Sequence, residues 1–286
     1  MNSHEMTQPP ALMAMLWRAW ATRRKRPGRV TELPAVRWTL PRVVVQASAV
    51  ERYRDVCGFA AEQGVPLTYP QLLTFPLVMA YLSSPECPWP AMGIVHLANV
   101  IEQIEPVRVG DELSVELDTG ALRSHDKGQV FDLDLIIRRD ARVVWRGQQT
   151  LLRRGVRKPV GEPWVSGVED EALLAPVVSF QAPHNIGRRY AWVSGDFNPM
   201  HLFWLSARLL GFRRTIAHGL WTQARALSHL LPREPLARAT LITEFKSPVF
   251  LPSQLAVWQH ATPHQSRFEV RDARAERYHL RALLSS

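Results

Sequence analysis

Two short patterns occur twice in this chain, and they occur in the same order each time. A Tyr-x-x-Val-x-Gly pattern begins at Tyr53 and again at Tyr190. A Pro-Val pair followed by Leu-x-Val begins at Pro106 and again at Pro248, and this second spacing differs from the first by five residues. Self-similarity of this kind is the sequence signature of a duplicated folding unit. The fold must therefore be one that two like units can build.

The densest polar cluster lies in the second copy. Asp196, Asn198 and His201 fall within six residues, around a glycine and a proline. Further on, His218-Gly219 precedes small and apolar residues at helical spacing, which predicts that a buried helix begins at or just after Gly219. We expect the polar cluster and the start of that helix to form two walls of one site.

Around these residues the chain resembles the MaoC-like family of (R)-specific enoyl-thioester hydratases and dehydratases. The resemblance is carried by Ser194-Gly195-Asp196-Phe197-Asn198-Pro199-Met200-His201, by Gly211-Phe212 and by Ala217-His218-Gly219-Leu220. A lone Asp-x4-His arises often by chance, whereas here the Asn-Pro pair and the distant His-Gly pair also fall at matching spacings. The resemblance implies an α+β fold, the double hot-dog, in which each of two tandem repeats wraps an antiparallel sheet around a long helix.

The resemblance also implies an activity, the reversible hydration of a trans-2-enoyl thioester to an (R)-3-hydroxyacyl thioester in fatty-acid metabolism. This reaction needs a base for water, an acid for C2 and a donor for the charge on the thioester oxygen. In the family, Asp196 and His201 would be the catalytic pair, and the backbone N–H of Gly219 would contact the thioester carbonyl. We expect the supporting residues to be Ser194, Asn198 and His218. Taken singly, Asp196 could cap a helix and His201 could be a core histidine.

Arginine carries the net charge of +9, because the chain has few lysines. Arginine forks match phosphate oxygens, so a phosphorylated ligand or an acidic carrier protein would suit this surface, although a compositional bias towards arginine explains the charge equally well. Arg213 and Arg214, just before the His-Gly pair, are candidates for binding coenzyme A or the prosthetic group of an acyl carrier protein. A solvated loop is the alternative. No zinc-finger or stacking-aromatic signature accompanies the charge, which argues against nucleic acid.

The sequence implies no cofactor and no metal. It has no glycine-rich phosphate loop after a strand, and Asp196, His201 and His218 lack the spacing of a dedicated ligand set. Its two cysteines, Cys57 and Cys87, form no disulfide framework, which favours a reducing cytoplasm. Two other functions stay open. A hot-dog thioesterase would not require the Asn-Pro-x-His string, and a non-catalytic acyl-thioester-binding subunit would not depend on Asp196 or His201.

We expect four segments: an N-terminal helix and connection (1–41), a first hot-dog repeat (42–153), a linker (154–176) and a catalytic repeat (177–286). A Ser-x-x-Glu capping box predicts a helix start at Ser48, and the helix expected over 69–82 is interrupted by Pro76. The apolar and basic run 11–26 is too short to span a bilayer but could associate weakly with its surface. The chain would act as a fused pseudo-dimer, alone or paired again as a homodimer.

The first repeat should have no catalytic site of its own. Carrying the Tyr-x-x-Val-x-Gly alignment forward places Phe59 opposite Asp196 and Gly64 opposite His201. Neither phenylalanine nor glycine can transfer a proton. The first repeat is therefore expected to serve the second.

Overall fold

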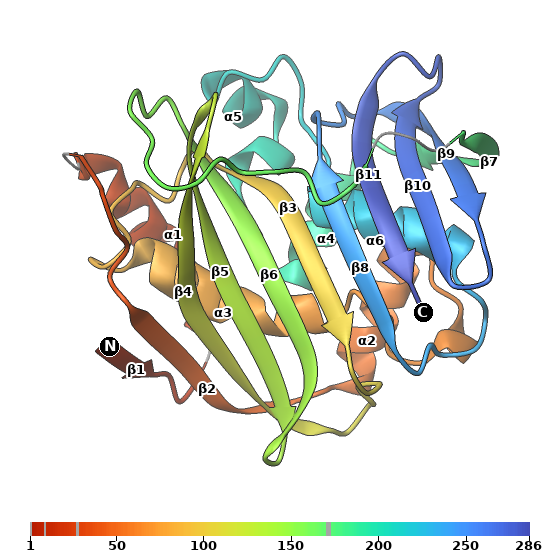
Figure 1. Cartoon of the computed structure of the whole chain (residues 1–286), viewed down its shortest axis with the longest axis horizontal. Coiled ribbons are helices and arrows are strands. Elements are labelled where there is room, and N and C mark those ends of the chain that lie inside the picture. Colours follow the sequence, from red (N-terminus) through yellow and green to blue (C-terminus); the bar gives the residue numbers. More distant parts are fainter. Residues whose placement is uncertain (1, 9, 27–28, 170–172) are drawn as a thin grey trace.

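The computed structural model describes residues 2–8, 10–26, 29–169 and 173–286, and its backbone is organised around one mixed sheet (Figure 1). The strands of the N-terminal half are β1 (Asn2–Glu5), β2 (Val36–Val44), β3 (Ile94–Gln103), β4 (Glu112–His125), β5 (Gly128–Arg139) and β6 (Arg142–Arg154). Those of the C-terminal half are β7 (Ala175–Ala182), β8 (Ala239–Phe245), β9 (Ser253–Ala261), β10 (Gln265–Asp272) and β11 (Tyr278–Ser285). The strand order is β1-β2-β4-β5-β6-β3-β8-β11-β10-β9-β7.

Apart from the additional edge strand β1, this order is symmetric about the antiparallel pair β3 and β8, which we call the seam. Outward from the seam, the N-terminal half runs β3, β6, β5, β4, β2, and the C-terminal half runs β8, β11, β10, β9, β7. Each half therefore repeats the same connections, as the duplicated patterns predict. The predicted repeat boundaries at residues 42 and 177 both fall inside strands, because β2 begins at Val36 and β7 begins at Ala175.

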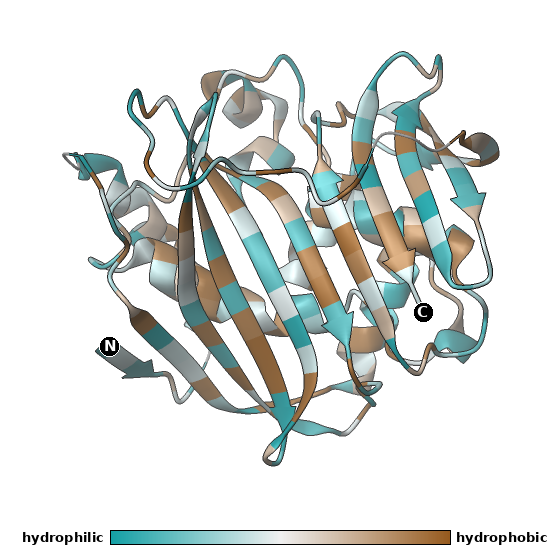
Figure 2. Cartoon of the chain, viewed as in Figure 1, coloured by the Kyte–Doolittle hydropathy of each residue, from teal (hydrophilic) through white to brown (hydrophobic). Residues whose placement is uncertain are grey.

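The helices cover one face of the sheet, behind it in Figure 1. They are α1 (Leu12–Ala21), α2 (Ala47–Cys57), α3 (Pro70–Ser83), α4 (Ile186–Ser194), α5 (Trp204–Leu209) and α6 (Gly219–Leu230), with short 3-10 turns η1 (Thr22–Arg24), η2 (Ala61–Gln63) and η3 (Pro199–His201). No helix in the described ranges is long and apolar enough to cross a bilayer. Hydrophobic and hydrophilic residues alternate along many strands (Figure 2), as expected when one face of a sheet is covered.

The repeated Tyr-x-x-Val-x-Gly pattern is the last turn of α2 and of α4. Each helix ends at a left-handed glycine, Gly58 with φ 82° and Gly195 with φ 78°. Glycine adopts this conformation without the strain that a Cβ would add, which explains why both copies have it there. The tyrosines of the two patterns, Tyr53 and Tyr190, are both fully buried and face each other with ring centroids 6.4 Å apart.

Two local predictions are wrong. Helix α2 begins at Ala47 with Gln46 as its N-cap, and no side chain caps it, so the capping box at Ser48 does not form. Helix α3 continues through Pro76 and does not break there. Its neighbours on the inner face, Leu77 and Val78, are buried in the core, and this packing offsets the backbone hydrogen bond that a proline cannot donate.

A single hydrophobic core crosses the seam. It contains large side chains from both halves, among them Trp145 of β6 and Trp221 of α6. The indole N–H of Trp221 donates to the carbonyl oxygen of Val56 in the other half at 3.0 Å. Truncating a buried side chain of this size to alanine typically costs about 3–5 kcal/mol of stability. Each half therefore depends on the other for the burial of its helices.

A fragment that begins at residue 160 should not form a stable monomer. It would expose the edge of β8 and the apolar faces of α4 and α6, and such surfaces promote self-pairing or aggregation. Size-exclusion chromatography with light scattering, run beside the full chain, measures this. A monodisperse fragment of monomer mass with cooperative unfolding would contradict the shared core.

Candidate active site

The loop that carries Asp196, Asn198 and His201 begins where α4 ends. The left-handed Gly195 turns the chain so that Asp196 leaves the helix axis. The backbone N–H of Asp196 donates to Ser194 Oγ at 3.2 Å, and the backbone N–H of Asn198 donates to Asp196 Oδ1 at 3.1 Å. The carboxylate is thus oriented by its own loop, with its side chain 35% exposed. Ser194 acts on the loop through its hydroxyl and Asn198 through its backbone.

His201 lies at the end of η3 and is oriented by a second segment of chain. Its Nδ1 is 2.8 Å from the carbonyl oxygen of Ile216. A carbonyl only accepts, so Nδ1 carries the proton and Nε2 keeps its lone pair. The loop is also held against α4, because a Cβ added to Gly187 would lie 2.0 Å from the carbonyl oxygen of His201. Only glycine allows the two backbones to approach this closely.

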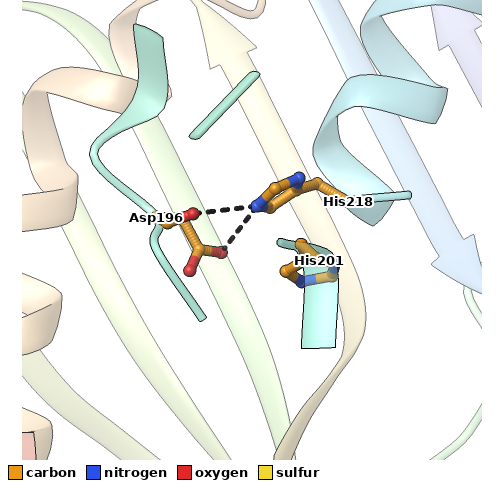
Figure 3. A group of neighbouring side chains, drawn as sticks. All are labelled: Asp196, His201 and His218. Carbon is orange, nitrogen blue, oxygen red and sulfur yellow. Dashed lines mark hydrogen bonds and ion pairs between the residues drawn. The ribbon is translucent and has the colours of Figure 1, made fainter. Parts of the chain in front are cut away.

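His218 completes a reciprocal arrangement. Its Nε2 lies 2.9 Å from the backbone carbonyl oxygen of Asp196 and 3.7 Å from Asp196 Oδ2. Its ring stacks on that of His201, with centroids 3.7 Å apart and an interplanar angle of 27°. Figure 3 shows the three side chains converging from two loops. Each histidine therefore donates to a carbonyl of the loop that carries the other histidine.

Burial keeps both rings neutral. Desolvation and, to a smaller extent, the neighbouring His201 lower the pKa of His218 to about 3, against the opposing effect of Asp196. Desolvation also lowers the pKa of His201, against the charge of Asp196 and the hydrogen bond to Ile216. A neutral His201 near pH 7 can accept a proton at Nε2.

Backbone hydrogen bonds fix the segment before α6 on both sides. The N–H of Ile216 donates to the carbonyl of Met200 at 3.2 Å, and that of Ala217 donates to Val249 at 2.9 Å. Within the same segment, Arg213 and Arg214 are exposed and lie over the ring of Phe250, at 4.6 and 5.7 Å from its centroid. The two arginines are thus beside the site but do not enter the Asp–His cluster.

Gly219 is the first residue of α6, as predicted, and His218 is its N-cap. The first N–H groups of a helix have no partner within the helix and carry its positive dipole end, which suits a developing negative charge. A Cβ at Gly219 would lie 2.8 Å from the ring of Phe245. The ring of Phe245 therefore closes one side of this helix start.

Comparisons with known proteins identify the family of this chain. A family model described as MaoC like domain matches residues 178–280. The 3-hydroxyacyl-thioester dehydratase X of Mycobacterium tuberculosis is 34% identical over 253 residues, which are 88% of this chain and 90% of that protein. The chain belongs to the MaoC-like dehydratase family.

Solved structures confirm the predicted α+β double hot-dog fold of this MaoC-like protein. The crystal structure of HtdX from M. tuberculosis has a TM-score of 0.75 at 30% identity, covering 87% of this chain and 98% of that one. A second M. tuberculosis protein, described as having a double hotdog fold, has a TM-score of 0.55 at 15% identity, with coverage of 90% and 96%. This second likeness concerns the fold alone.

A further histidine reaches the MaoC-like site from the other half. His96 on β3 lies with its ring centroid 5.0 Å from that of Phe245, and its Nε2 is buried with no hydrogen-bond partner in the described part of the chain. Desolvation lowers its pKa to about 4, opposed by a hydrogen bond to the backbone of Ala98 and by the charge of Asp196. Motif reasoning missed His96 because only the pairing across the seam brings it here.

The equivalent place in the first half is an open groove of about 420 Å³. Phe59 and Gly64, the residues aligned with Asp196 and His201, both line it. No aspartate or histidine is among the residues that line this groove. The shape of the repeat is retained there without the acid–histidine pair.

The low histidine pKa values predict a loss of stability in acid. In the unfolded chain each histidine takes up a proton below about pH 6.5, whereas the folded chain resists it, so the unfolded state binds more protons. For each such histidine, the free energy of unfolding should fall by about 1.4 kcal/mol per pH unit as the pH drops from about 6.5 towards the folded pKa. Urea unfolding between about pH 7 and pH 4 measures the slope. His218→Gln should flatten it, whereas His264→Gln, at an exposed position, should not. Equal slopes in the two variants would contradict the shift.

Proposed function

We propose that this chain catalyses the reversible hydration of a trans-2-enoyl thioester to an (R)-3-hydroxyacyl thioester, and the reverse dehydration, in fatty-acid metabolism. One observation carries the proposal: the carboxylate of Asp196 and the rings of His201 and His218 offer ligating atoms within 4.8 Å of one another, beside the start of α6. The name of the M. tuberculosis relative, a 3-hydroxyacyl-thioester dehydratase, supports it.

Asp196 and His201 supply the proton transfers. In hydration, one member of the pair removes a proton from water as its oxygen bonds to C3, and a proton is delivered to C2. In dehydration the same groups act in reverse. Because the carboxylate and the imidazole are coupled, we assign acid and base roles to the pair and not to its members. The backbone N–H of Gly219 would donate to the thioester oxygen as negative charge develops on it.

His218 is proposed as a positioning residue. Its Nε2 is occupied by the carbonyl of Asp196, and its ring supports that of His201. The hydrogen bond from Nε2 to Asp196 leaves only Nδ1 of His218 without this partner. In His201, Nδ1 is engaged by the carbonyl of Ile216, which leaves Nε2.

The carrier of the acyl group is proposed to be coenzyme A or an acyl carrier protein. Both present phosphate at the far end of a thioester arm, and the exposed guanidinium groups of Arg213 and Arg214 are placed beside the site to meet it. Only the second repeat is proposed to be catalytic. A hot-dog thioesterase is the rival, and following enoyl absorbance and free-thiol release in one assay separates the two.

Removing either member of the catalytic pair should abolish most of the activity. Asp196→Asn and His201→Ala should each lower kcat about a hundred- to ten-thousand-fold, because a general acid–base partner is lost. Hydration of an enoyl-CoA followed by absorbance, with circular dichroism to verify folding, measures this. Asp55→Asn and His264→Ala, at exposed positions, are matched controls. Near-normal rates in either site variant would refute the assignment.

Arg213→Gln and Arg214→Gln should weaken substrate binding and leave chemistry intact. Each should raise KM for an enoyl-CoA about fivefold with little change in kcat, because an exposed charge contact contributes up to about 1 kcal/mol. The corresponding N-acetylcysteamine thioester, which has no phosphate, should show no such effect. Arg157→Gln, on the exposed linker, is the control. A KM unchanged for the CoA thioester would leave both arginines as solvated loop residues.

A further inference from the structure

The chain around the active site exposes an unusual number of large apolar side chains. Leu209 is 81% exposed, Trp192 75% and Trp204 64%. We define the mouth surface as the exposed apolar residues Trp192, Phe203, Trp204, Leu205 and Leu209 together with the exposed arginines Arg188, Arg189 and Arg208. Large exposed apolar clusters on a folded protein mark contact with a protein or a membrane.

The mouth surface is part of the same structural unit as the loop that carries Asp196. Ser206 of α5 donates from Oγ to the carbonyl of Pro199 in η3 at 2.7 Å. Arg188 of α4 donates to the carbonyl of Leu202 at 3.2 Å. The rings of Trp192 and Phe197 meet edge to face at 5.0 Å, one residue from Asp196. Whatever binds the mouth surface therefore lies next to the loop that carries Asp196; α5 is at the top in Figure 1.

Charge identifies the class of partner. From residue 186 to residue 218 the chain has five arginines, and its only acidic residue is Asp196. A second copy of this chain, pairing through the same surface, would set these arginines against one another with almost no acid to neutralise them. Anionic phosphates complement them instead. Tryptophan, phenylalanine and leucine beside arginine are the composition of segments that lie in a bilayer interface.

We propose that the mouth surface docks on the anionic face of a lipid bilayer. The aromatic and leucine side chains enter the headgroup region, and Arg189 and Arg208 contact lipid phosphates. The loop that carries Asp196 then lies beside the membrane. The docking itself does not depend on the proposed hydratase chemistry, so each can fail without the other. If both hold, amphiphilic long-chain thioesters reach the site from the membrane side.

A second basic and apolar element must be distinguished from the mouth surface. Helix α1 exposes Met13, Trp17 and Trp20, with Arg23 just beyond its end. Its other face, including Met15 and Ala19, is buried. Weak membrane association was expected from this part of the sequence. The test therefore includes a variant of α1.

Co-sedimentation of the full-length protein with phosphatidylcholine vesicles, with and without phosphatidylglycerol, tests the proposal. We expect binding that requires phosphatidylglycerol and weakens as salt is added. The double variant Trp204→Ser/Leu209→Ser should lower the vesicle partition coefficient at least tenfold, since each side chain loses its apolar burial. Arg189→Gln/Arg208→Gln should lower it about fivefold for each arginine. The matched controls Val165→Ser and Arg157→Gln, exposed on the linker, should bind as wild type.

Three results would overturn the proposal. One is wild-type protein that stays in the supernatant at low salt. Another is binding that Trp17→Ser abolishes while Trp204→Ser/Leu209→Ser retains it, which would assign docking to α1. The last is a mouth-surface variant that changes the sedimentation-velocity mass and not vesicle binding, which would make this surface a protein interface. Thermal unfolding of each variant verifies that the fold is intact.

Discussion

The antiparallel pairing of β3 with β8 is the interaction on which the rest of the structure depends. It joins the two halves along six residue pairs, from Ala98↔Glu244 to Gln103↔Ala239. Because the strands of both halves continue outward from the seam, all of them belong to one sheet. The helices of both halves pack against this sheet around one hydrophobic core. The seam also sets the composition of the site, since it carries His96 of one half to Phe245 of the other, and the ring of Phe245 lies against Gly219.

Within that frame, the site is positioned mainly by backbone groups. His201 is oriented by the carbonyl of Ile216, and His218 by the carbonyl of Asp196. Each loop thus holds the other's imidazole, so neither ring can turn without breaking a bond between the loops. Backbone carbonyls accept and never donate, which specifies the protonated nitrogen of each ring. The tautomers that the chemistry needs follow from the path of the chain. The backbone N–H of Asn198 donates to the carboxylate of Asp196, and Ser194 Oγ accepts from the backbone N–H of Asp196.

Sequence reasoning succeeded where the information is local or repeated. Asp196 and His201 lie in one loop, so their spacing in the sequence indicates that they are close. The glycines at the ends of α2 and α4 recur because the left-handed cap conformation favours glycine. It failed where tertiary packing decides. The break at Pro76 is a reasonable local preference that burial of α3 overrides. The capping box at Ser48 does not form because α2 begins one residue earlier, at Ala47. His96 carries no local signal, because it approaches the site through strand pairing between residues far apart in the chain.

The duplicated architecture is compatible with the proposal that only one of the two repeats is catalytic. In an assembly of identical subunits, any change that removes the acid–histidine pair from one subunit removes it from all. Once two copies share a chain, each can change separately. The first half has a cap glycine, Gly58, and hence the same turn, while Phe59 and Gly64 stand at the positions aligned with Asp196 and His201. In exchange it supplies groups to the other site. Phe75 of α3 packs at Gly195, and the imidazole of His96 lies against the ring of Phe245, so the first half shapes the surroundings of Asp196.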